Sequence, residues 1–247
     1  MTTPSAQLAD PLAEERARLR ALEPGFSSHA GFNARMIDYC FRSVRPWVDG
    51  AGRCVELGCS DGRMTAKLLG CVEHLTAVDG SPAYTDAVQA ALPTVEVVHA
   101  MFEEFTSAQP FDVAVLGHVL EHVEDPVLIL QRARCLVRRG GRVIVTVPNA
   151  DSLHRQVGVA MGMLEHRQAL NEGDLRIGHR RVYTSDELLG DVAVAGLRPI
   201  HAGGIFLKPL SDAQMERDWS PELVDAYYEL GKAHPDLCAN LLVVAER

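Results

Sequence analysis

Apolar residues recur at helical spacing early in the chain and then fall into short runs. Over residues 32–48 the apolar positions lie three or four residues apart, which predicts an amphipathic helix. Beyond this segment, short apolar runs bounded by glycine or proline alternate with helical patterns. Strands are predicted at 53–57, 74–78, 95–98, 111–117, 142–147, 197–207 and 237–245, and helices at 63–69, 82–92, 126–137, 184–194 and 221–232.

This alternation predicts parallel βαβ units with right-handed crossovers and a ligand at the carboxyl ends of the strands. The Ala-, Glu- and Arg-rich residues 1–24 predict a further helix, ended by Pro24 and Gly25. Residues 138–141 predict a turn, and the glycine pair 203–204 predicts a β-bulge.

Composition narrows the class of protein. The chain has 247 residues, enough for one large α/β domain, and a net charge of −9, which argues against a nucleic-acid-binding face. We expect pairs such as Arg180 and Arg181 to be solvated surface. The N-terminus does not resemble a secretion signal, no segment predicts a membrane span, and the six cysteines form no CxxC pair. We therefore expect a cytoplasmic enzyme that binds neither nucleic acid nor membrane.

The sequence VELGCSDG at 55–62 suggests a nucleotide-binding turn with an unusual charge. Its glycines are spaced GxxxG rather than GxGxxG, and the acids Glu56 and Asp61 would oppose a pyrophosphate, which disfavours NAD and FAD. Asp79 ends the next predicted strand, where an acid accepts hydrogen bonds from ribose hydroxyls. A ribose-bearing cation without a pyrophosphate fits this pattern, and S-adenosylmethionine is such a ligand.

From residue 55 to residue 149 the chain resembles the class I S-adenosylmethionine-dependent methyltransferases. Besides VELGCSDG, the segments LTAVDGSP, HAMFEEF, FDVAVLGHVLEHVEDP and LVRRGGRVIVTVPN resemble successive motifs of that family in order. The resemblance implies an α/β fold, a Rossmann-like doubly wound seven-stranded sheet of order 3-2-1-4-5-7-6 with the last strand antiparallel. The cofactor-binding residues that it implies are Glu56, Gly58, Cys59, Asp61, Gly62, Asp79, Gly80, Met101, Phe102, Glu103, Gly117 and His118.

The segment LGHVLEHV offers candidate catalytic chemistry after the fourth strand. His118, or His179 further along the chain, could act as a general base toward the acceptor. Alternatively, His118, Glu121, His122 and His179 could bind a divalent metal, as ExxEH and a later histidine do in the ubiquinone-pathway and small-RNA O-methyltransferases that this segment resembles. Here His118 replaces an acid, which disfavours magnesium and favours softer metals. In a third interpretation the segment is a structural turn, and a metal is not the favoured one.

Three segments are predicted to cover the site: a helical cap over residues 1–50, and lid insertions at about 150–182 and 208–236 in a methyltransferase domain over 51–247. Apolar side chains from these segments and the strand before the last insertion could line a cavity, although such residues more often belong to the core. They are Met161, Met163, Phe206, Trp219, Tyr227 and Tyr228. The remaining histidines His29, His154, His166 and His201 are expected at the surface or behind the cavity wall.

Together these features predict methyl transfer to a small molecule, first of all to a hydroxyl oxygen, because a histidine-rich site suits deprotonation. Fold-level analogy adds secondary metabolism or sugar tailoring. The alternatives are N-methylation of a small amine, metal-assisted O-methylation, RNA methylation, an NAD-dependent oxidoreductase and a non-catalytic binding module. The sequence leaves homo-oligomerisation open.

Overall fold

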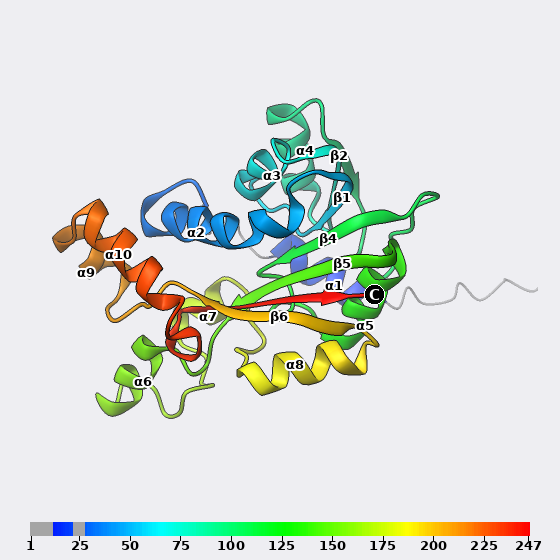
Figure 1. Ribbon diagram of the computed structural model, residues 1–247. Coiled ribbons are helices and arrows are strands. Elements are labelled where there is room, and N and C mark those ends of the chain that lie inside the picture. Colours follow the sequence, from blue (N-terminus) through cyan, green and yellow to red (C-terminus); the bar gives the residue numbers. More distant parts are fainter. Residues whose placement is uncertain (1–11, 22–27) are drawn as a thin grey trace, which may run out of the picture.

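A seven-stranded sheet lies at the centre of the protein, in the order β3-β2-β1-β4-β5-β7-β6 (Figure 1). The structure is a computed structural model that describes residues 12–21 and 28–247. β7 is antiparallel to both β5 and β6, and the other neighbours are parallel, which confirms the predicted order and orientation. The strands are β1 (Ala51–Leu57), β2 (Val72–Asp79), β3 (Glu96–His99), β4 (Phe111–Gly117), β5 (Val137–Pro148), β6 (Arg198–Ile205) and β7 (Asn240–Glu246).

Helices cover both faces of the sheet (Figure 1). Apolar residues of α5 and α8 pack on one face, and those of α2, α3, α4 and α10 pack on the other. None of the helices in the described ranges is long and apolar enough to cross a bilayer. The helices are α1 (Ala13–Ala21), α2 (Gly31–Val48), α3 (Arg63–Leu68), α4 (Pro82–Ala91), α5 (Pro126–Leu136), α6 (Leu153–Ala160), α7 (Glu172–Arg176), α8 (Ser185–Val194), α9 (Asp212–Asp218), α10 (Pro221–Gly231) and the short 3-10 helix η1 (Pro235–Leu237).

Local sequence signals explain where several helices begin. The Asp125 side chain accepts a hydrogen bond from the Leu128 amide and Pro126 opens α5, so an otherwise unsatisfied donor is paired. Thr184 and Glu187 form a reciprocal capping box at α8. Helix α1 confirms the middle of the helix predicted near the N-terminus, whereas the predicted break at residues 24–25 lies outside the described ranges.

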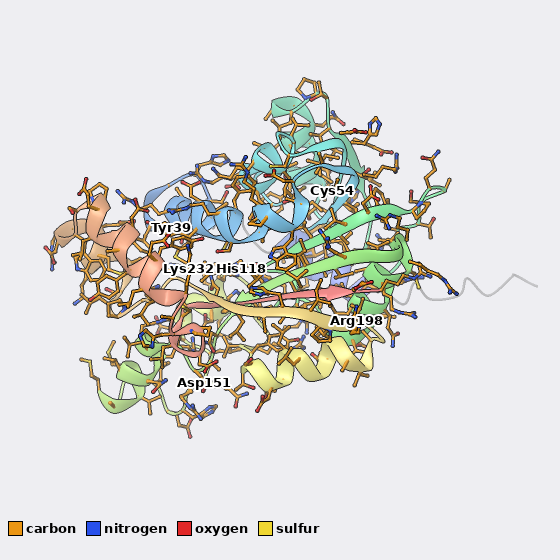
Figure 2. The ribbon with its side chains drawn as sticks, in the orientation of Figure 1. Tyr39, Cys54, His118, Asp151, Arg198 and Lys232 are labelled. Atoms are coloured by element: carbon orange, nitrogen blue, oxygen red, sulfur yellow. The ribbon has the colours of Figure 1, made fainter. Side chains whose placement is uncertain are left out.

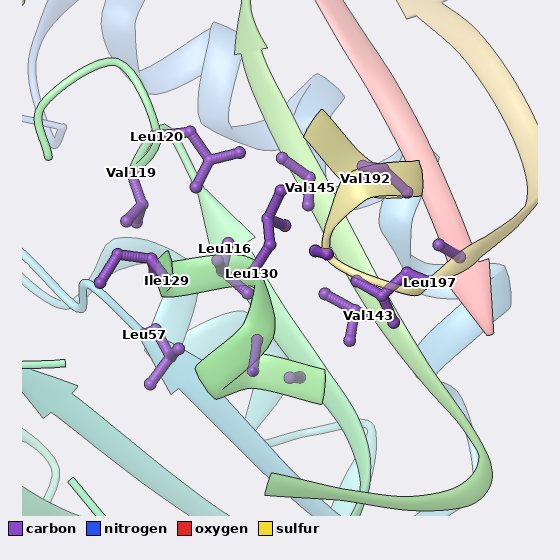
Figure 3. Packing of buried hydrophobic residues seen from close by; sticks show 14 of the residues in the cluster. Leu57, Leu116, Val119, Leu120, Ile129, Leu130, Val143, Val145, Val192 and Leu197 are labelled. Carbon is purple, nitrogen blue, oxygen red and sulfur yellow. The ribbon is translucent and has the colours of Figure 1, made fainter. Parts of the chain in front are cut away.

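The larger apolar core lies between the sheet and α5 with α8, and its buried side chains include Leu116, Leu130 and Val192 (Figure 3). On the opposite face the Tyr39 ring stacks on the rings of Phe206 and Tyr228 at centroid distances of 5.5 and 4.6 Å.

The methionines and aromatics of the covering segments that could line the ligand cavity do not line it, and the interpretation of the aromatics as core residues holds. Phe206 and Tyr228 are core residues, and Trp219 packs against Tyr227 at the edge of that core. Met161 and Met163 are 68% and 73% exposed, because the segment after α6 runs along the surface and does not turn inward.

Two local predictions also fail. Residues 138–141 lie within β5 rather than in a turn between elements, although the pairing with β4 does skip from Val137 to Arg142 around them. The glycines at 203–204 pair in regular register with β7, and the irregularity in β6 lies between Pro199 and His201 instead. Proline has no amide proton to donate to the ladder, which explains why the register shifts there.

Gly204 allows a close contact and not a bulge. A Cβ at this position would lie 2.3 Å from the Pro235 carbonyl oxygen and 2.7 Å from Cys238 Cβ. The absence of a side chain therefore lets η1 pack directly on β6.

We predict that Gly204→Ala lowers the free energy of unfolding by about 1–3 kcal/mol, because backbone atoms must move to admit the methyl group. Gly190→Ala is the matched control, since a Cβ there meets nothing within 4 Å and alanine favours a helix by ~1 kcal/mol. Urea unfolding of both variants measures the difference, and a Gly204→Ala protein as stable as the wild type would contradict this packing.

Candidate active site

A cavity of about 920 Å³ lies at the carboxyl ends of the central strands. Residues that follow β1, β2, β4 and β5 line it, including Gly58, Gly80, His118 and Asn149. Figure 2 labels His118, which directly follows the last residue of β4. The ends of parallel strands are where α/β sheets bind ligands, as the sequence predicted.

Gly58 begins the turn after β1 in a left-handed conformation, with φ of +88°. A Cβ at this position would lie 2.7 Å from Val119 Cγ2, so both the backbone conformation and the available space require glycine. The bare backbone at this turn allows a ligand to approach the main chain closely.

Asp79 ends β2 and lies in the cavity wall. Its carboxylate accepts hydrogen bonds from the Ser60 amide at 3.1 Å and the Ser81 amide at 2.9 Å. Burial raises the pKa of Asp79, and these amide donors oppose the shift. The carboxylate is thus fixed in direction and keeps further acceptor capacity for a ligand hydroxyl.

Glu56 lines the same region but is almost fully buried. It accepts a hydrogen bond from Thr65 Oγ1 at 2.6 Å. Burial raises the pKa of Glu56 to about 8, so this carboxyl is mostly protonated in the cofactor-free protein at neutral pH.

Asp61 has a role that the motif alone did not suggest. Its carboxylate accepts hydrogen bonds from the backbone amide and the side-chain hydroxyl of Ser28. His29 Nε2 lies 3.1 Å from the Asp61 carbonyl oxygen. Asp61 therefore ties the segment before α2 to the turn after β1, in addition to lining the cavity.

All but one of the cofactor residues predicted from the sequence line this cavity. They are Glu56, Gly58, Cys59, Asp61, Asp79, Gly80, Met101, Phe102, Glu103, Gly117 and His118. The exception is Gly62, which precedes α3 and faces Val88. Sequence reasoning missed Tyr84, which lines the cavity from α4, although its place just after the second motif could have suggested it.

The sequence also missed residues that reach the cavity from distant segments. His154, expected at the surface or behind the wall, lines the cavity. Burial and the nearby cations Lys208 and Arg155 lower the pKa of His154 to about 3. This ring is therefore neutral at physiological pH. Because His154 lines the cavity, the expectation that it lies at the surface or behind the cavity wall is wrong.

Both ring nitrogens of His118 have partners within the protein. Nδ1 lies 3.0 Å from Glu121 Oε1 and Nε2 lies 3.8 Å from Cys40 Sγ. Burial would lower the pKa of His118, but the contacts with Cys40 and Glu121 outweigh it and raise the pKa to about 10. A protonated His118 has no lone pair with which to accept a proton.

His179 has the opposite character. Its Nδ1 lies 3.2 Å from Asp174 Oδ1, and its Nε2 stays available. Burial would raise the pKa of Asp174, but hydrogen bonds from His179 and the Asn171 amide, with the Arg155 charge, lower it to about 2. Because an ionised Asp174 only accepts, the Nδ1 proton of His179 points at its carboxylate and Nε2 is the ring nitrogen left to face a ligand.

Glu121, His122 and His179 come together beside the cavity. One potential ligand atom from each lies within 4.8 Å of the other two, and the rings of His122 and His179 meet edge to face at 4.7 Å. Glu121 is fully buried, and among the described residues its Oε2 has no hydrogen-bond partner. His118, the fourth predicted ligand, is not part of this group and instead binds the other oxygen of Glu121.

Three arginines hold the turn that carries these residues. The His122 carbonyl oxygen accepts from Arg18 Nη2 at 2.7 Å and from Arg180 Nε at 3.0 Å. Arg181 donates to the carbonyl oxygens of Leu120, Val123 and Glu124. Arg180 and Arg181 are therefore structural donors, and the expectation that this pair is only solvated surface is wrong.

Comparison with known proteins agrees with this geometry. Residues 9–202 match the family described as a methyltransferase domain. The chain is 27% identical over 169 residues to a ubiquinone biosynthesis O-methyltransferase of Aeromonas salmonicida, covering 65% of this chain and 68% of that protein. A second such protein, from Aromatoleum aromaticum, is 31% identical over 116 residues, covering 42% and 50%. This match spans about half the length of that relative.

Among solved structures, the fold resembles the N-methyltransferase NodS from Bradyrhizobium japonicum in complex with S-adenosylhomocysteine. The TM-score is 0.58 at 14% identity, over 96% of this chain and 99% of that one. A sheet of this order with a ligand cavity at its strand ends defines a Rossmann-like methyltransferase fold. The chain belongs to the methyltransferase domain family, and its fold is that of the class I S-adenosylmethionine-dependent methyltransferases.

We predict that Glu56→Gln changes how stability depends on pH. The folded-state pKa of Glu56 is about 8 against a usual 4.5, so its contribution is present at low pH and is lost as pH rises through about 8. Between about pH 5 and about pH 8 the cofactor-free wild type should lose several kcal/mol of unfolding free energy relative to the variant. Urea unfolding across this range measures it.

The control is Glu96→Gln, because Glu96 also accepts from a threonine hydroxyl, at 2.7 Å, but is exposed. This variant should follow the wild-type pH dependence. Parallel curves for Glu56→Gln and the wild type would show that Glu56 is ionised throughout.

Proposed function

We propose that this methyltransferase transfers the methyl group to a hydroxyl oxygen of a small molecule, with His179 as the general base. The Asp174–His179 pair carries this proposal, because it sets a basic nitrogen with a fixed tautomer in the cavity wall. The names of the curated relatives, O-methyltransferases, support an oxygen acceptor.

Several features support a small acceptor. Residues of α1 and α2, of the segment 148–179 and of the segment 208–212 all contribute to the cavity wall, so the chain surrounds the ends of the central strands from three directions. The net charge of −9 offers little attraction to a nucleic acid.

In the proposed reaction, the first half of the cavity binds the cofactor. The fixed carboxylate of Asp79 accepts from the ribose hydroxyls, and the glycine turn at Gly58 admits the ligand close to the backbone. When bound, S-adenosylmethionine supplies an electrophilic methyl group on a sulfonium. Asp61 and Asp79 give this half of the cavity the acidic character that suits a cationic ligand.

His179 then removes the hydroxyl proton at Nε2 while the acceptor oxygen forms its bond to the methyl carbon. The bond from that carbon to sulfur breaks, which leaves S-adenosylhomocysteine, a neutral thioether. Asp174 stabilises the imidazolium that forms and holds the ring in place. His118 is less suited to this role, because both of its nitrogens face protein partners and its pKa of about 10 keeps it protonated.

A second candidate is metal-assisted O-methylation at the same place. The unpartnered, fully buried Glu121 Oε2 and the grouping of Glu121, His122 and His179 fit a metal ion. These three residues would hold it, and it would polarise the acceptor oxygen as a Lewis acid. Two imidazoles and one carboxylate suit zinc or iron better than magnesium. The Asp174–His179 hydrogen bond would then orient a ligand, as carboxylates often do behind metal-binding histidines.

The cofactor assignment predicts tight binding of S-adenosylhomocysteine to the purified protein and no binding of NADH. Asp79→Ala should weaken the first by about 10–100-fold, because charge-assisted hydrogen bonds to the ribose are lost. Isothermal titration measures both ligands. Asp86→Ala, on the exposed side of α4, is the control and should bind like the wild type. Failure of the folded wild type to bind would refute the site.

The base assignment predicts that His179→Gln lowers kcat by about 10²–10⁴-fold while S-adenosylhomocysteine affinity stays unchanged. Release of S-adenosylhomocysteine with a hydroxylated acceptor measures the rate. Chelator treatment separates the two candidates: a wild-type rate that survives complete metal removal supports the base, and a rate restored only by zinc or iron supports the metal. His166→Gln, at an exposed position, is the control.

A further inference from the structure

One part of the cavity wall contains a group of basic side chains that are not used in the proposed methyl transfer. Lys208, His154 and Arg155 line the cavity together with Ser211 and Asp212. They come from α6, from the residues after β6 and from the start of α9. We call Lys208, His154 and Arg155 the basic corner.

Lys208 has donors to spare. Its side chain is 16% exposed, and Nζ lies 2.7 Å from Asp212 Oδ1. An ammonium group carries three N–H donors, so this ion pair leaves two for a ligand. Because Asp212 balances the charge of Lys208, Lys208 offers a ligand hydrogen-bond donors rather than net charge.

His154 has an unmet hydrogen-bonding capacity. Its Nδ1 is buried and has no hydrogen-bond partner in the described part of the chain. Leaving a buried polar atom unpaired is costly, and such atoms in a ligand cavity are commonly paired by the ligand. Burial and the charges of Lys208 and Arg155 keep the ring neutral, so it can donate one hydrogen bond without adding charge.

Arg155 adds a fixed positive charge behind these two residues. Its side chain is 5% exposed, and the guanidinium donates to the carbonyl oxygens of Arg167 and Ala169 and to Asp174 Oδ2 at 3.2 Å. The other oxygen of Asp174 binds His179. The Asp174 carboxylate thus links the proposed base to the basic corner. Both line the same cavity and can contact one acceptor molecule.

We propose that the basic corner binds a carboxylate of the acceptor, so that the substrate is a hydroxylated carboxylic acid whose hydroxyl faces His179. This inference rests on the proposed function. The carboxylate would accept from the two remaining donors of Lys208 Nζ and from a His154 N–H, so that the buried ring of His154 gains a partner.

The experiment is isothermal titration of the protein saturated with S-adenosylhomocysteine. The ligands are hydroxybenzoic, hydroxycinnamic and aliphatic hydroxy acids, each compared with its primary amide and, where available, its phosphate ester analogue. At least one acid should bind about 10–100-fold more tightly than its amide, as expected for charge-assisted hydrogen bonds. Lys208→Met should abolish that preference, and Lys208→Arg should keep most of it.

Lys67→Met is the matched control, because Lys67 Nζ also lies 2.7 Å from an aspartate, Asp38, but outside the cavity. It should leave the acid-to-amide ratio unchanged, and thermal unfolding confirms that each variant is folded. The inference is overturned if no acid outbinds its amide, if phosphates bind best, or if Lys208→Met keeps the preference. S-adenosylhomocysteine binding by the wild type in the same experiment shows that such a failure concerns the basic corner and not the cofactor site.

Discussion

Hydrogen bonds from arginine side chains to backbone carbonyl oxygens hold the active-site turn, and the arrangement of the acceptor half of the cavity depends on them. The turn after β4 leaves the carbonyl oxygens of Leu120, His122, Val123 and Glu124 pointing toward arginines. Arg18 comes from α1, and Arg180 and Arg181 come from the segment that carries His179. The same guanidinium groups that satisfy the turn therefore fix His122 relative to His179. The position of a side chain is defined this closely only when hydrogen bonds also fix the backbone that carries it.

The two oxygens of the buried Glu121 carboxylate have different surroundings. One oxygen binds His118, whose positive charge and hydrogen bond hold the pKa of Glu121 below its usual range despite complete burial. The other faces the His122 and His179 group without a hydrogen-bond partner. The ExxEH pattern that this segment resembles would place an acid at position 118. Histidine there makes the group less negative, which disfavours a hard cation.

The fold and the cofactor half of the cavity could be predicted because their signals lie in consecutive residues. The glycine turn after β1, Asp79 at the end of β2 and the caps of α5 and α8 depend on local backbone chemistry, which short segments encode. The acceptor half depends on contacts between distant segments. His154 and Lys208 are 54 residues apart in the sequence, and no periodic pattern relates them. The position of Met161 was open for the same reason, because it depends on the path of the chain after α6.

Helix α1 joins the rest of the protein in a different way from the other helices that line the cavity. It has no buried residue, yet Glu15, Arg18 and Leu19 lie in the cavity wall. Ion pairs of Arg16 with Glu104 and of Glu15 with Arg180 help to hold it against the rest of the protein, and both are partly exposed to water. Salt screens such pairs far more than it affects an apolar core. Raising the ionic strength should therefore weaken the attachment of α1 to the cavity wall at salt concentrations that leave the apolar core of the sheet unchanged.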